Sequence, residues 1–306
     1  MKWEKLGRIF DCEQMPLWSS NSALTPTPFL INEEILRVYC SFRDDNGVGQ
    51  IGYIDLSASD PRKVIKVGDE LCLSKGKPGR FDDNGLILGD VIRDPDGILR
   101  MYYVGFQKAA NVKFLAFSGV AFSQDGLFFE RYSEAPIMDR CDKAHSIRAI
   151  HSVIFENGIY KIWYAVGDSW QSINGIDYPR YNIWYTESPD GLSFNGVSVL
   201  CVDVTGNEYR IGRPSVTKVD GGYLMIYTRG NSDGKDYFPG VAFSKDGVNW
   251  ERRDEELGLS LGADDDFDSI HLCYPRLIQS KGNWFAFYNG NYMGLHGFGA
   301  ARLKSW

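Results

Sequence analysis

Apolar and polar residues alternate along this chain in short stretches that end at glycine-rich turns. In residues 89–105, an apolar run enters the turn Pro95-Asp96-Gly97, and a run rich in β-branched and aromatic residues follows. This pattern predicts two antiparallel strands joined by a tight turn. The pattern recurs, and the first strands of the five copies are predicted to begin at residues 27, 90, 151, 213 and 274.

The spacing of these copies is nearly constant. Their first residues are 63, 61, 62 and 61 positions apart, and a fixed period made of short strands indicates a repeat architecture. A repeat of about 60 residues holds one four-stranded sheet, and radial arrangement of sheets protects their edges. The prediction is an all-β, five-bladed β-propeller that forms a single domain over residues 1–306. The expected blades are residues 24–75, 86–135, 147–202, 210–255, and 271–306 together with 2–10.

The last repeat supplies only three strands by its own pattern. Residues 2–10 alternate well enough to form a strand, yet they precede the first repeat. We expect them to pair with the last sheet and close the ring, because closure removes the free edges that favour aggregation.

Two recurrent polar motifs are predicted to be architectural. Ser-x-Asp-Gly occurs at residues 123–126, 188–191 and 244–247, where Ser and Asp side chains can bond local backbone and Gly can take a positive φ. Arg93-Asp94-Pro95 leads directly into a hairpin turn, so Asp94 is predicted to be a turn residue on the face opposite any site.

The other face concentrates groups that can bind a ligand. Residues just before each first strand and just after each second strand should share this face. Carboxylates, guanidinium groups, imidazoles and aromatic rings meet there, and a concave site with such groups suits a sugar-like ligand. The predicted substrate-binding residues are Asp83, Arg43, Gln107, His151, Asp168, Trp170, Tyr209, Arg210, Arg213, Arg229, His271, Tyr274, Asn291 and Tyr292.

Composition excludes several classes of protein. The net charge is −7 and no basic run occurs, which argues against a nucleic-acid partner. No stretch has the apolar length of a transmembrane helix, and the first residues lack a signal-peptide core, so we expect a cytoplasmic protein without a membrane partner. The six cysteines occur singly and no short metal-ligand spacing is present, so neither a metal nor a cofactor is predicted.

The chain resembles the five-bladed glycosidase superfamily, which includes arabinanases, invertases, levansucrases and mannoside phosphorylases. It looks closest to uncharacterised "glycosylase" relatives associated with bacterial surface-polysaccharide gene clusters. The resemblance covers nearly the whole chain. The stretches that carry it are residues 81–85 with 89–91, 208–214, 267–269 with 273–275, and 287–291 with 297–299.

The resemblance implies an enzyme that acts on a glycosidic bond, but the acidic positions depart from it. Hydrolases of the superfamily carry an acidic residue on the first strand of three successive blades. The matching positions here are Thr27, Asp90 and His151 or Ser152, so only Asp90 is acidic. In the last blade, residues 268–270 read Asp-Ser-Ile where the relatives tend to carry Asp-Ser-Glu.

Cleavage of a glycosidic bond usually needs two carboxyl groups. Asp90 is predicted to be the central acid, Glu208 or Asp268 the second group, and Asp83 a further alternative for it. The mannoside phosphorylases instead use one Asp with basic residues that hold phosphate. Two alternatives therefore stay open: an inverting glycoside phosphorylase, and a non-catalytic sugar-binding or polysaccharide-assembly protein.

Side-chain charge also indicates the class of ligand. Arg210, Arg213 and Arg229 indicate an anionic part such as a phosphate, a uronate or a nucleotide sugar. Trp170, Tyr209 and Tyr292 are expected to stack on sugar rings. The predicted partner is a small carbohydrate or nucleotide sugar, with phosphate as an additional candidate.

Overall fold

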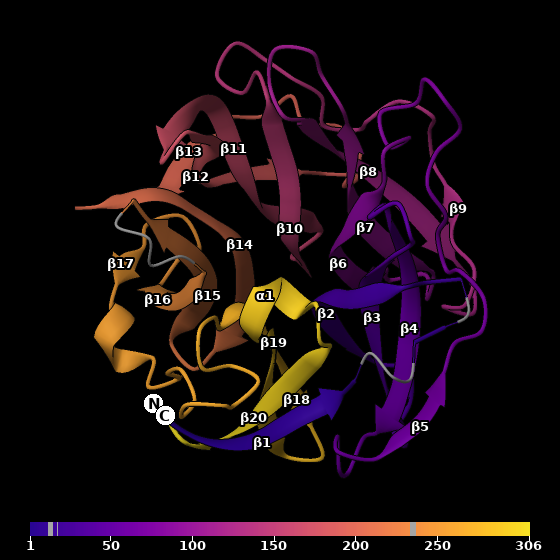
Figure 1. Cartoon of the computed structure of the whole chain (residues 1–306), viewed down its shortest axis with the longest axis vertical. Coiled ribbons are helices and arrows are strands. Elements are labelled where there is room, and N and C mark those ends of the chain that lie inside the picture. The colour runs from indigo at the N-terminus through magenta and orange to yellow at the C-terminus, as the bar shows by residue number, and fades with distance from the viewer. Residues whose placement is uncertain (12–14, 17, 233–236) are drawn as a thin grey trace.

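A computed structural model describes residues 1–11, 15–16, 18–232 and 237–306 of the chain. Its regular structure is almost all β-strand, and the sheets stand around a common centre (Figure 1). Apart from strands, the described residues form a short 3₁₀ turn, η2 (Asp254–Glu256), and a single helical turn, α1 (Asn291–Gly294). The all-β prediction is confirmed.

The strands pair in antiparallel groups that follow chain order. The first group is β2 (Asn21–Leu30), β3 (Ile35–Arg43), β4 (Gly49–Ser57) and β5 (Val64–Val67). The next is β6 (Leu86–Arg93), β7 (Leu99–Gln107), β8 (Leu115–Ser123) and β9 (Glu130–Arg131). It is followed by β10 (Ile147–Glu156), β11 (Ile159–Ile173), β12 (Ile176–Ser188) and β13 (Val199–Val202).

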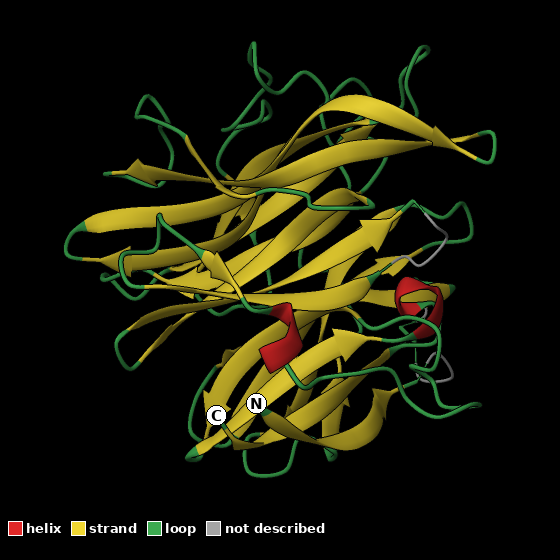
Figure 2. Cartoon of the chain, turned by 90° about the vertical axis from the view of Figure 1, so that its left-hand side faces the viewer, coloured by secondary structure: helices red, strands yellow, loops and turns green. Residues whose placement is uncertain are grey.

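Two further groups complete the described strands. One is β14 (Glu208–Val219), β15 (Gly222–Asn231), β16 (Phe238–Ser244) and β17 (Glu251–Arg252). The other joins the two ends of the chain: β18 (Cys273–Ser280), β19 (Asn283–Asn289), β20 (Phe298–Ser305) and β1 (Lys2–Phe10). β1 pairs antiparallel with β20, which confirms the pairing predicted for residues 2–10 and brings the N- and C-termini together (Figure 2).

The first strand of each group begins earlier than predicted. The observed starts are residues 21, 86, 147, 208 and 273, whereas the sequence pattern predicted 27, 90, 151, 213 and 274. Each first strand extends further at its inner end than the hairpin pattern indicated, by one residue in β18 and by four to six residues in the other four strands. Residues such as Asp90, His151 and Arg213 therefore lie within strands and not in front of them.

The Ser-x-Asp-Gly turns fasten neighbouring groups to one another. In each copy the Gly N–H donates to the Ser hydroxyl, at 2.9, 2.8 and 2.8 Å, and the Gly has φ of 73°, 68° and 82°. An aromatic donor from the preceding group reaches each Gly carbonyl: Tyr39 to Gly126, Tyr102 to Gly191 and Trp163 to Gly247, at 2.8, 3.0 and 2.8 Å. The architectural interpretation of this motif is confirmed.

Asp94 also has a structural environment. It is 8% exposed and accepts two hydrogen bonds from the Arg100 guanidinium, at 2.9 and 2.7 Å, and one from the Tyr160 hydroxyl at 3.1 Å. The prediction that Asp94 belongs to the turn is consistent with these contacts. None of the described helices is long and apolar enough to cross a membrane.

Candidate functional site

The first strand of each group carries an irregularity near the centre of the molecule. A β-bulge bends a strand and redirects a side chain, and bulges are frequent beside active sites. The pairing register shifts between residues 24 and 27, 88 and 90, 150 and 152, 212 and 215, and 273 and 276. The residues that the register passes over include Thr25, Gly89, His151, Arg213 and Tyr274.

These irregular segments surround a cavity of about 630 Å³ at the inner ends of the first strands. Its walls come from every strand group, together with the loop before β8 and the extended hairpin of β11 and β12. The volume lies within the range of ligand pockets, which is about 300–1,000 Å³. We call this space the axial cavity.

Six of the fourteen predicted substrate-binding residues line the axial cavity. The predicted residues that line it are Arg43, His151, Arg210, Arg213, His271 and Tyr274. They come from the ends of second strands, from first strands and from the segment before β18, so the predicted shared face holds for these positions. Their role in binding stays a prediction.

Other predicted binding residues lie outside the described cavity lining. Gln107 lines a separate hollow of about 400 Å³, and Asp168 and Tyr209 line another of about 380 Å³. The Asp83 carboxylate accepts from the Gly79 N–H at 2.9 Å. Trp170 is not among the described lining residues, but its ring packs edge-to-face on that of the lining residue Phe114, with centroids 5.3 Å apart.

Asn291, Tyr292 and Arg229 have supporting contacts. Asn291 accepts from the backbone N–H groups of Ile270 and His271, at 2.7 and 3.0 Å, and the Tyr292 N–H donates to His271 Nδ1 at 3.0 Å. These bonds position His271, which lines the cavity. Arg229 forms ion pairs with Glu208 and Asp254, at 3.1 and 3.0 Å.

The predicted catalytic carboxylate Asp90 is not among the described residues that line the axial cavity. It is 3% exposed, forms an ion pair with Arg276, and accepts from the N–H groups of Val91 and Val153, both at 2.7 Å. Arg276 Nη1 also donates a hydrogen bond to the His151 carbonyl at 2.7 Å. Burial raises the pKa of Asp90 above its usual value, against the opposing effects of Arg276 and the backbone N–H groups.

Glu208 and Asp268 sit in ion-pair networks outside the described lining. Glu208 is held by Arg252 at 2.7 and 2.8 Å and by Arg229 at 3.1 Å. Asp268 is 1% exposed and accepts from Lys5 at 2.6 Å and from the Tyr288 hydroxyl at 2.9 Å. Because these partners saturate both groups, the structure does not bring the three predicted catalytic carboxylates into one ligand-facing cluster.

Arg213 and His151 contact each other in the lining of the axial cavity. Together with Thr25 and Tyr274, which also lie at bulges of first strands, they form what we call the floor. Arg213 Nη1 donates to the Leu88 carbonyl and to His151 Nδ1, the latter at 3.0 Å. Burial and the neighbouring Arg276 lower the pKa of Arg213 to about 9. Burial, Arg213 and Arg276 lower the pKa of His151 well below its usual value, so this imidazole is neutral at pH 7.

Sequence reasoning missed several lining residues. Lys113 and Phe114 precede β8, and Asp177, Tyr178 and Tyr181 lie on the extended hairpin of β11 and β12. A signal for the hairpin was present, because Asn174-Gly175, a dipeptide typical of two-residue hairpin turns, joins the two stretches, and both residues have positive φ. Thr25, Tyr237 and Met293 also line the cavity, and their positions follow from tertiary packing.

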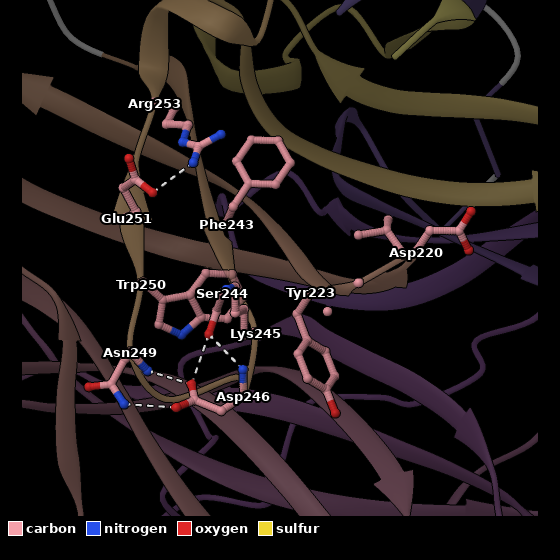
Figure 3. A pocket seen from close by; sticks show the side chains of 13 residues that line it. Asp220, Tyr223, Phe243, Ser244, Lys245, Asp246, Asn249, Trp250, Glu251 and Arg253 are labelled. Atoms are coloured by element: carbon pink, nitrogen blue, oxygen red, sulfur yellow. Dashed lines mark hydrogen bonds and ion pairs between the residues drawn. The ribbon is translucent and has the colours of Figure 1, made fainter.

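A second hollow, of about 610 Å³, lies at the other end of the group that contains β14 (Figure 3). Its polar groups are largely paired with one another. Asp246 accepts from the Ser244 hydroxyl at 3.0 Å and from Asn249 at 2.8 Å, and Glu251 pairs with Arg253 at 2.7 Å. We therefore place the candidate site in the axial cavity. Among the described residues, no cluster of three or more His, Cys, Asp or Glu side chains is arranged to hold a metal ion.

Solved structures share this fold over nearly the whole chain. A structure described as a BT0996 RGII complex has a TM-score of 0.74 and 17% identity, with coverage of 98% of this chain and 91% of the other. A thermostable family-43 glycoside hydrolase has a TM-score of 0.68 and 18% identity, covering 97% and 94% of the two chains. A member of the GH130 family, whose description names mannoside phosphorylases and glycoside hydrolases, has a TM-score of 0.66 and 13% identity, covering 93% and 85%. The chain thus has a glycoside hydrolase-like fold.

Sequence comparison places the chain more closely. It is 31% identical over 306 residues to the uncharacterized proteins MT1551 and Rv1502 of two Mycobacterium tuberculosis strains, covering 100% of both chains in each case. The protein belongs to the family of these mycobacterial proteins. No family model matches the sequence.

Proposed function

We propose that this protein is a five-bladed β-propeller enzyme that acts on a glycosidic bond of an anionic sugar held in the axial cavity. The strand groups beginning with β2, β6, β10, β14 and β18 are its blades, and β1 completes the last one. The observation that carries this proposal is the chemistry of the cavity wall. The glycoside hydrolase-like fold supports the reaction class, and the neighbour described as an RGII complex supports a carbohydrate ligand.

The described cavity lining carries four cationic side chains and one carboxylate. The cations are Arg43, Lys113, Arg210 and Arg213, and the carboxylate is the exposed Asp177. Arginine is suited to carboxylate and phosphate groups because its planar fork donates two parallel hydrogen bonds. A site with this balance of charge favours an anionic ligand.

Aromatic side chains in the lining can bind the apolar face of a sugar ring. The described lining includes Phe106, Phe114, Tyr178, Tyr181, Tyr237 and Tyr274. Apolar faces of sugar rings pack on aromatic side chains, while the hydroxyl and amide groups of a polar rim fix orientation. Cations and rings on one wall therefore match a sugar that bears a charged substituent.

Asp90 is the carboxyl group that we assign to proton transfer. A general acid must be protonated at the working pH, and burial moves the pKa of Asp90 in that direction. Glu208 is a weaker candidate because Arg252 and Arg229 lower its pKa against the effect of burial, whereas the pKa of Asp90 stays raised although Arg276 pairs with it. Asp268 is weaker because its partners Lys5 and Tyr288 do not line the cavity, whereas Arg276 connects Asp90 to the lining residue His151. Movement of Arg276 away from Asp90 when a ligand binds would release the carboxyl group toward the floor.

A second candidate function is phosphorolysis of the same bond. Hydrolysis needs a carboxylate to activate water, and Asp177 is the only carboxylate in the described lining. Phosphate is itself a nucleophile and would be held by Arg210 and Arg213. The cationic lining therefore favours phosphate as a co-substrate more than it favours a second catalytic carboxylate.

A turnover experiment tests this proposal. Chromogenic glucuronides and galacturonides are compared with the matched glucosides and galactosides, with and without inorganic phosphate. We expect release from the uronides, and stimulation by phosphate if the second candidate is right. Asp90→Asn should abolish release. Because it also removes the counter-charge of Arg276, its activity is measured at a temperature at which circular dichroism shows the variant to be folded. Full activity of the folded variant would contradict the assignment of Asp90.

A further inference from the structure

The floor of the axial cavity presents hydrogen-bond donors in a strained backbone. Thr25, Arg213 and Tyr274 have φ of 55°, 54° and 57°, and each precedes a proline. Positive φ is a genuine outlier for a β-branched or bulky residue. Such strain persists where the surrounding structure enforces it, and it clusters at ligand sites.

Thr25 carries a hydroxyl group without a partner. Its Oγ1 is buried and makes no hydrogen bond among the described residues, although Thr25 lines the cavity. The backbone around it is fixed, because the Thr25 N–H donates to the buried Asn289 side chain at 2.8 Å, and Asn289 donates onward to the carbonyls of Ala23 and Gly297 at 2.8 and 3.0 Å. A buried hydroxyl left unpaired costs free energy that a ligand oxygen would recover.

Arg213 has unused donors. Its two described hydrogen bonds both use Nη1, and a guanidinium has five N–H groups. In the described part of the chain, Nη2 and Nε have no hydrogen-bond partner, and Arg213 pairs with no carboxylate. Burial and Arg276 lower the pKa of Arg213 to about 9, although Tyr274 and Asp90 act in the opposite direction.

His151 is fixed in one tautomer by Arg213. A guanidinium can only donate, so Nδ1 accepts the bond and the neutral ring carries its proton on Nε2. Nε2 has no hydrogen-bond partner among the described residues. The charged groups that act on this imidazole are Arg213 from β14 and Arg276 from β18. Arg276 donates to the His151 carbonyl and pairs with Asp90 from β6.

We infer that the floor of the axial cavity is an oxyanion subsite, in which Arg213, the neutral His151 and Thr25 bind the terminal carboxylate or phosphate of the sugar. The sugar ring that bears the charged group enters first, so its glycosidic bond also lies near the floor, on the side of Asp90. This inference rests on the proposed function and specifies where the charged group of the ligand binds. The alternative position is near Lys113, which is exposed, and Arg43, which is partly exposed, because both also line the cavity.

The test measures dissociation constants by calorimetry for three sugars that differ only at one carbon: glucuronate, glucose 6-phosphate and glucose. Arg213→Met should weaken both anionic probes by about 30-fold or more, as expected for loss of a charge-assisted pair. Thr25→Val should weaken them about 5-fold, with an unchanged melting temperature, because the hydroxyl has no partner in the free protein. Lys245→Gln removes the same charge at the far end of β16 and should change neither.

His151 gives an independent readout. Glucuronate stays ionised from pH 6.5 to 8, and a neutral imidazole donor predicts constant affinity over that range. His151→Gln keeps an N–H donor and should stay within about 3-fold of the wild type, whereas His151→Phe should lose about 10-fold. A tenfold fall in wild-type affinity from pH 6.5 to 7.5 would show a cationic histidine and overturn the neutral-donor assignment.

The outcomes separate the two levels of the proposal. If glucuronate and glucose 6-phosphate bind no better than glucose, the anionic-sugar function itself fails. If the anions bind preferentially but Arg213→Met matches Lys245→Gln, the function stands and the floor assignment is wrong. If only one of the two anions binds better than glucose, and Arg213→Met abolishes that preference, the floor assignment stands. The anion that is preferred then identifies carboxylate or phosphate as the cognate group.

Discussion

Arg100 and Arg213 lie at opposite ends of the strands and differ in their partners: Arg100 pairs with a carboxylate of the protein, whereas Arg213 keeps donors that a ligand can use. Arg100, at the turn end, is 6% exposed and pairs with Asp94 at 2.7 Å. Burial acts to lower the pKa of Arg100, but Tyr102 and Asp94 outweigh it and the pKa is raised. Arg213, at the cavity end, contacts a carbonyl and an imidazole, and its pKa is lowered.

The same contrast holds for other buried groups. At the turn end, Arg37 pairs with Asp55 at 2.7 Å, and the aromatic donors reach glycine carbonyls. At the cavity end, Thr25 Oγ1 has no partner among the described residues. Paired buried charges and saturated donors fix the fold, whereas donors left open beside a cavity define a place for an acceptor from outside.

The largest expected effect comes from breaking the paired end. Asp94→Ala leaves Arg100 buried without its counter-charge, and such a change costs about 3–5 kcal/mol. Urea unfolding should show this loss, while Asp220→Ala in the exposed turn between β14 and β15 should stay within about 0.5 kcal/mol of the wild type. A loss below about 1 kcal/mol for Asp94→Ala would mean that the pair is not structural.

The pH dependence of stability should report His151 next. Its pKa is lowered in the folded state, so the unfolded chain binds a proton that the folded chain excludes. Stability therefore falls as the pH drops below about 6.5, with a slope approaching 1.4 kcal/mol per pH unit from this one group. His151→Gln should remove that part of the slope between pH 6.5 and 5, and identical profiles for both proteins would contradict a buried neutral imidazole.

The smallest effect on stability is expected at the open end. Arg213→Met removes a partly buried charge that pairs with no described carboxylate, at the cost of two hydrogen bonds, so the free energy of unfolding should stay within about 1 kcal/mol of the wild type. The same variant should lose affinity for anions. If Arg213→Met and Asp94→Ala lower the free energy of unfolding equally, the proposed difference between the turn end and the cavity end is wrong.

The sequence predicted the all-β class and the pairing of residues 2–10, because alternation and turn chemistry are local signals. It also selected Asp94 and the Ser-x-Asp-Gly turns as structural, since turn chemistry depends on neighbouring residues. Their long-range bonds, from Tyr160 to Asp94 and from Tyr39 to Gly126, were not predicted. It did not predict that Asp90 pairs with Arg276 or that Glu208 pairs with Arg252, which are contacts between distant segments. The alternation of apolar and polar residues also could not locate the β-bulges. The bulges redirect the side chains of Thr25 and Arg213 and so determine that both residues line the cavity.

The affinity of the wild-type protein for glucuronate relative to glucose at pH 7 tests the anionic-sugar proposal most directly. These sugars differ only in the carboxylate, so the ratio isolates the charge preference of the axial cavity. We predict at least about tenfold tighter binding of glucuronate, which corresponds to about 1.4 kcal/mol. Equal affinities, or tighter binding of glucose, would contradict an anionic sugar as the ligand.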